Sequence, residues 1–102
     1  RNQLEGGCVQ GASWALKEAV QVEGNVITSL DWDTYPILRF SDVPDIHAEL
    51  IENRDDPALG VGECTVGPTA AAIGNAVAHA LGRRIDDMPL TRDRVMATLL
   101  AE

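Results

Sequence analysis

The chain has 102 residues, of which 45% are hydrophobic and 4% aromatic. This length allows one domain with a modest core. Because much of the apolar content is alanine, we expect a partner or further chain to complete the burial. The net charge of −8 argues against nucleic acids and anionic membrane surfaces as partners, since both are bound through Lys and Arg.

The sequence does not indicate a membrane span, a secretory signal, a zinc site or a disulfide. No apolar run approaches the ~18 residues of a membrane span. No secretory signal is visible. The two cysteines, Cys8 and Cys64, lack the spacing of a zinc site and do not require a disulfide. Because the sequence starts at Arg1, without Met, and runs almost at once into a helical pattern, we expect a piece of a longer polypeptide or a processed product. That polypeptide would be cytoplasmic, or periplasmic if its N-terminus carries an export signal.

The first predicted element is a helix over about 7–22. Its apolar stripe comprises Val9, Ala12, Leu16 and Val20. Gly24 is a natural residue to follow its C-terminus. Gly11 weakens the helix and indicates a close packing contact.

Two strands are predicted next, over 25–30 and about 45–52, with a turn at Gly24-Asn25 before the first. Between them lies an irregular segment that holds most of the aromatic residues. The second strand alternates between apolar and polar side chains and is therefore expected to be half exposed. Residues 53–57 form a polar loop.

The clearest predicted helix covers 69–81, with Pro68 at its first position and Gly82 as its stop. It is apolar almost all round, which predicts burial on several sides. A short strand over 83–88 and a helix over about 92–101, capped by Thr91, complete the chain. The predicted fold class is α+β, with a small antiparallel or mixed sheet packed by two longer helices plus a C-terminal helix.

Glu63 is the first candidate functional residue, because it ends the glycine-rich stretch Gly60-Val61-Gly62 just before a helix. Such a carboxylate can serve as a general base. The alternative is that it only stabilises the N-terminus of that helix. Gln3 is the second candidate, since a glutamine before Gly6-Gly7 can hydrogen-bond a ligand that approaches the backbone. Its alternative is a polar helix entry.

Four motifs in this order resemble one family. They are Gln3-Leu4-Glu5-Gly6-Gly7-x-x-Gln10-Gly11, Tyr35-Pro36-Ile37-Leu38-Arg39, Gly60-Val61-Gly62-Glu63 and Pro68-x-x-Ala71-Ala72-Ile73-x-Asn75-Ala76. The sequence resembles the C-terminal part of the molybdopterin-binding large subunit of the xanthine dehydrogenase and aldehyde oxidase family, the molybdenum hydroxylases. Within that family it resembles in particular the isoquinoline 1-oxidoreductase or nicotinate dehydrogenase type. Residues 1–102 would then be a fragment of a molybdopterin-binding domain.

The resemblance implies an oxidoreductase that inserts water-derived oxygen at an electron-poor carbon of an aldehyde or N-heterocycle. It implies Glu63 as the general base on Mo–OH, with Gln3, Gly6, Gly7 and Gly62 near the cofactor and no protein ligand to the metal. The cofactor would be molybdenum–molybdopterin, in bacteria often the cytosine dinucleotide. Partners would be the remainder of the large subunit and an iron–sulfur electron-transfer subunit.

Large subunits of this family are several times longer than this chain, and the glycine loops and arginine that hold most of the pterin are absent from it. We therefore expect the fragment alone to bind no cofactor and to be inactive. The alternative reading is a non-catalytic acidic interaction or folding module that retains the family sequence. A small hydrolase using Glu63 is a third reading, but it lacks a suitably placed second carboxylate or histidine.

Overall fold

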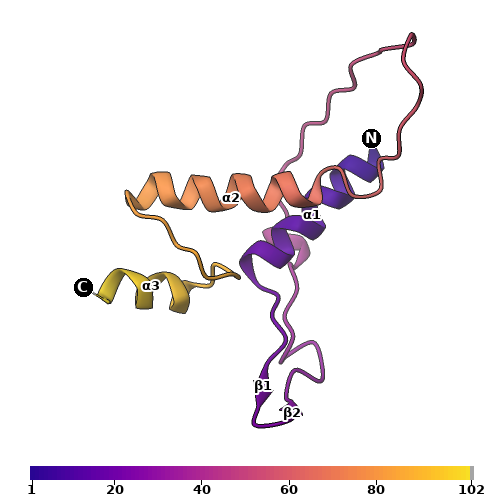
Figure 1. The fold of residues 1–102 in the computed structure, drawn as a ribbon. Coiled ribbons are helices and arrows are strands. Elements are labelled where there is room, and N and C mark those ends of the chain that lie inside the picture. The colour runs from indigo at the N-terminus through magenta and orange to yellow at the C-terminus, as the bar shows by residue number, and fades with distance from the viewer. Residues whose placement is uncertain (102) are drawn as a thin grey trace.

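The computed structural model describes residues 1–101 and confirms a small α+β arrangement (Figure 1). The helices are α1 (Asn2–Leu16), α2 (Val66–Leu81) and α3 (Arg92–Leu100). The strands β1 (Val22–Glu23) and β2 (Val26–Ile27) form one antiparallel pair, and η1 (Phe40–Asp42) is a 3-10 turn. The two long helices pack on each other, whereas the strands contact only one another among the described elements.

Helix α1 is the element to which distant parts of the chain attach. The hydroxyl of buried Ser13 accepts a hydrogen bond from the Leu38 backbone N–H at 3.0 Å. The Ala15 carbonyl accepts one from the Leu90 N–H at 2.7 Å. The small core lies here as well, and its buried apolar residues are Ala12, Ala15, Ile85 and Leu90.

Glycines let α1 approach the start of α2. A Cβ at Gly11 would lie 2.8 Å from the carbonyl oxygen of Val66, which is closer than real Cβ contacts come. The close packing contact predicted at Gly11 is therefore confirmed. Helix α1 starts at Asn2 and not at about residue 7 as predicted, so Gly6 also lies inside it. The same packing accounts for Gly7, where an added Cβ would meet Thr65. Contact with α2 offsets the low helix propensity of glycine.

The C-terminal bound of the first helix is a second correction. The predicted helix ran to residue 22, but α1 ends at Leu16 and the chain turns away at Lys17. Val20 is 60% exposed. Because most of that side chain faces solvent, burial does not hold a last helical turn together.

The strand predictions were only partly right. Of the strand predicted over 25–30, only Val26–Ile27 is extended and paired. The turn at Gly24-Asn25 is confirmed, and Gly24 has φ 59°. The predicted strands over 45–52 and 83–88 form no regular element. Alternation alone does not make a strand, because the backbone groups need a partner strand, and the described chain offers none there.

Helix α2 starts earlier than predicted, at Val66, so that Pro68 lies in its first turn, where its missing N–H costs nothing. Gly82 ends it with φ 66°, as predicted. However, none of its residues is buried, so the predicted burial on several sides is not found within residues 1–101. The prediction for α3 is confirmed, since the Thr91 hydroxyl accepts a hydrogen bond from the Arg94 N–H at 3.4 Å.

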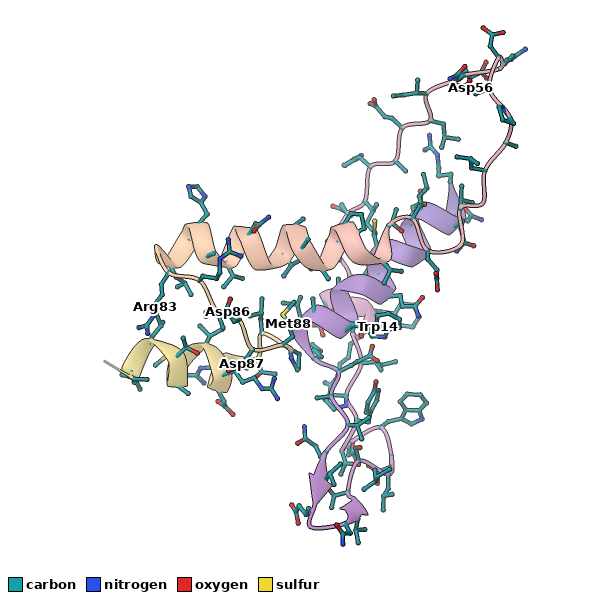
Figure 2. All side chains as sticks on the ribbon, viewed as in Figure 1. Trp14, Asp56, Arg83, Asp86, Asp87 and Met88 are labelled. Atoms are coloured by element: carbon teal, nitrogen blue, oxygen red, sulfur yellow. The ribbon has the colours of Figure 1, made fainter. Side chains whose placement is uncertain are left out.

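The molecule is elongated and loosely covered. Its radius of gyration is 16.6 Å, against ~13 Å for a compact domain of this size. Residues 49–64 are exposed throughout and form a long excursion, with Asp56 at the end far from the helices (Figure 2). Large apolar side chains such as Phe40, 101% exposed, face solvent. Among the described helices, none has the length and apolar character to cross a bilayer.

Candidate active site

Two candidates from opposite parts of the sequence meet at the first turn of α1. The Gln3 side chain donates a hydrogen bond from Nε2 to the carbonyl oxygen of Gly62 at 3.1 Å. The two residues are 59 positions apart in the sequence. The motif around Gln3 and the glycine-rich loop are thus in direct contact.

A second contact joins the same two segments just beyond the loop. The Thr65 hydroxyl donates to the carbonyl oxygen of Leu4 at 3.2 Å. It lies against buried Gly7, where an added Cβ would come within 2.1 Å of Thr65 Oγ1. The loop is therefore attached to α1 on both sides of Glu63.

Glu63 lies between these two attachments and is exposed. Its backbone carbonyl accepts a hydrogen bond from the Val66 N–H at 3.3 Å. Within residues 1–101 no hydrogen bond or ion pair reaches its carboxylate. No side chain caps α2 and no acidic residue lies in its first turn, so Glu63 makes no capping bond to that helix. The carboxylate is free to contact another molecule.

The two glycines of the first motif have different surroundings. A Cβ at Gly6 would meet nothing within 4 Å, and Gly6 is exposed. It borders a groove of about 450 Å³ between the first turns of α1 and the segment over 43–46. At Gly7, in contrast, the Thr65 side chain occupies the space that a Cβ would need. Of these two glycines, Gly6 is the one that leaves room for a bound group beside the backbone.

Sequence reasoning missed Thr65 and Leu4, which hold the loop in place. A signal was present in the spacing of Gly7 and Gly11, since residues four apart share one helix face. Two glycines on one face indicate that another backbone approaches there. The sequence does not say which segment makes that approach.

The donor set fits a cofactor whose metal is held by its own ligands. In the described part of the chain, no three His, Cys, Asp or Glu side chains gather in a way that could hold a metal ion. Cys8 and Cys64 are free thiols. What the site offers is an exposed carboxylate, an amide and an open glycine, which suit hydrogen bonding and proton transfer.

Comparison with known proteins identifies the family. No model of a known protein family matches the chain. It is 39% identical over 102 residues to a subunit of the nicotinate dehydrogenase of Pseudomonas putida, covering 100% of this chain and 9% of that subunit. It is 41% identical over 88 residues to the beta subunit of isoquinoline 1-oxidoreductase from Brevundimonas diminuta, covering 86% of this chain and 11% of that subunit.

A third relative is named as a molybdenum-binding subunit. The chain is 33% identical over 99 residues to the xanthine dehydrogenase molybdenum-binding subunit of Escherichia coli, covering 91% of this chain and 13% of that subunit. The chain belongs to the molybdenum hydroxylase family. Molybdenum hydroxylases are oxidoreductases, and the resemblance seen in the four motifs is confirmed. The chain spans about a tenth of the length of the first two of these curated relatives.

Proposed function

We propose that this chain supplies the general base of a molybdenum hydroxylase that oxidises an aldehyde or N-heterocycle at an electron-poor carbon, with oxygen from water. The observation that carries the proposal is the 3.1 Å bond from Gln3 to Gly62. It joins two family motifs at one site and leaves the neighbouring Glu63 carboxylate exposed. The names of the relatives, which include nicotinate dehydrogenase and isoquinoline 1-oxidoreductase, support a heteroaromatic substrate.

Each residue has a separate task in this proposal. A carboxylate oxygen of Glu63 accepts the proton of the hydroxyl that is transferred to the substrate, which makes that oxygen a better nucleophile. Gln3 donates a hydrogen bond from Nε2 to the Gly62 carbonyl, and its Oε1 accepts a hydrogen bond from the cofactor. Gly6 lets a flat group approach the backbone. Gly62 accepts the bond that holds the loop on α1, and Gly7 leaves the space in which Thr65 lies.

The bound molybdenum–molybdopterin, which we propose to be the cytosine dinucleotide form, supplies the oxygen and accepts the electrons from the substrate. An iron–sulfur subunit then carries the electrons away. The remainder of the large subunit holds most of the cofactor and forms the substrate pocket. This chain contains only part of the site, so alone it binds no cofactor and has no activity.

The test is made in the complete enzyme, expressed with its electron-transfer partner. Nicotinate, isoquinoline, xanthine and benzaldehyde are screened with a dye as electron acceptor. Glu63→Gln should lower kcat by ~10²- to 10⁴-fold with molybdenum content unchanged, because an amide cannot accept the proton. Glu49→Gln, an exposed glutamate of the excursion, is the matched control and should leave kcat unchanged.

Two results would refute the proposal. Near-normal turnover by Glu63→Gln would remove the base role and favour the alternative, a non-catalytic acidic folding or interaction module. A preparation that turns over without molybdenum, or with a quinone in its place, would show that the cofactor is wrongly assigned.

A further inference from the structure

The hydroxyl of Thr65 is not used as its position in the fold would suggest. Thr65 is the N-cap of α2, where a threonine usually accepts a hydrogen bond from an N–H of the first helical turn. Here no side-chain cap bond forms. The hydroxyl instead donates to the Leu4 carbonyl of α1 at 3.2 Å, across 61 positions in the sequence.

The surface of α1 is shaped to receive this side chain. At Gly7 an added Cβ would lie 2.1 Å from Thr65 Oγ1 and 3.5 Å from Thr65 Cβ. One turn further, at Gly11, it would lie 2.8 Å from the carbonyl oxygen of Val66. Gly7 and Gly11 therefore form a notch that holds residues 65 and 66 against α1. A larger residue at Gly11 would push the start of α2 outward, and one at Gly7 would displace the Thr65 hydroxyl.

Thr65, which the notch holds, follows Glu63 by two residues. Gly62, which accepts the bond from Gln3, directly precedes Glu63. Both attachments use the first turn of α1, so the backbone of Glu63 is held between two points of one rigid element. We propose that Thr65 is a positioning residue for Glu63: its bond to Leu4 and its seat on Gly7 fix where the Glu63 carboxylate is presented. The kinetic part of this inference rests on the proposed function, whereas the structural attachment does not.

The test uses Thr65→Val in the complete enzyme, because valine keeps the shape of threonine and removes the hydroxyl. Misplacing a catalytic group by about 1 Å can cost ~10²-fold in rate. We expect kcat to fall by ~10- to 100-fold, with KM and molybdenum content unchanged. Thr65→Ser keeps the hydroxyl and should restore most of the rate. Thr98→Val is the matched control, since among residues 1–101 the Thr98 hydroxyl bonds only to the Arg94 carbonyl within α3, at 3.0 Å.

Two readouts separate positioning from general damage. In the Glu63→Gln background, Thr65→Val should cause no further loss of kcat, because residues that act as a unit are not additive. Amide hydrogen exchange over residues 62–66 should be faster in Thr65→Val than in wild type and unchanged in Thr98→Val. This second readout does not depend on catalysis.

The outcomes distinguish this inference from the proposed function. Wild-type kcat in Thr65→Val, or an undiminished loss of rate in the Glu63→Gln background, overturns the positioning role. If Glu63→Gln itself keeps near-normal turnover, the proposed function fails. Exchange over 62–66 then decides the attachment alone: faster exchange in Thr65→Val upholds it, and unchanged exchange overturns it.

Discussion

The packing of α1 on α2 at Gly11 gives a prediction with a magnitude. In Gly11→Ala the new Cβ would lie 2.8 Å from the Val66 carbonyl oxygen and 3.2 Å from Thr69 Cβ. The first of these atoms belongs to the backbone, so the side chain cannot be accommodated by a rotamer change. Helix α2 has to move outward, and such overpacking costs about 1–3 kcal/mol.

A gain in helix propensity opposes this cost. Replacing a helical glycine by alanine stabilises a helix by about 1 kcal/mol, so the net loss at Gly11 is about 0–2 kcal/mol. Gly74 in α2 is the matched control, because an added Cβ there would meet nothing within 4 Å. Gly74→Ala should show only the gain. The two variants should therefore differ by about 1–3 kcal/mol.

Native-state amide hydrogen exchange of α2 in the complete subunit measures this difference locally. Since 1.4 kcal/mol corresponds to a factor of ten, exchange in Gly11→Ala should be about 5- to 140-fold faster than in Gly74→Ala. Equal slowing of exchange in both variants would refute the reasoning. It would mean that α2 does not approach α1 closely at Gly11.

Two further predictions concern the ends of α1 and α3. In Thr91→Ala the N-cap bond with Arg94 is lost, so exchange of α3 amides should rise ~5-fold, corresponding to about 1 kcal/mol. The control Ser41→Ala, outside α3, should leave this exchange unchanged. Unchanged exchange in Thr91→Ala would contradict the cap. At the end of α1 the Lys17 ammonium donates a hydrogen bond to the Asp42 carboxylate. This bond, together with one from the Arg39 N–H, lowers the pKa of Asp42. The contribution of Asp42 to stability is therefore present above the ordinary carboxyl pKa and is lost as pH falls through the lowered value. In Lys17→Gln an NMR titration should give a higher pKa for Asp42 than in wild type, Arg54→Gln should not change it, and an equal pKa in Lys17→Gln and wild type would disprove the ion pair in solution.

Local signals in the sequence predicted local structure correctly. Gly82 ends α2, Thr91 caps α3, and Gly24-Asn25 turns the chain, because each depends on a few neighbouring residues. The strand predicted over 45–52 failed for the opposite reason, since a strand needs a partner that alternation does not specify.

The candidate site shows the same division. Its residues could be selected from motifs, and the family resemblance placed Gln3 and Glu63 in one site. The contacts that hold the loop could not be predicted. The bond from Thr65 to Leu4 joins segments 61 positions apart. The sequence around either residue does not indicate which segment it will contact.

The exposed excursion has a consequence for how this region can change in evolution. Its residues 49–61 lie between two attachments to α1, at Leu38 and at Gly62, and supply the bonding atoms of neither. Doubling the length of a flexible loop adds only about 0.6 kcal/mol to the cost of closing it. Insertions near Asp56 could therefore remodel what the subunit presents to its surroundings, while the seat of the loop on α1 stays in register.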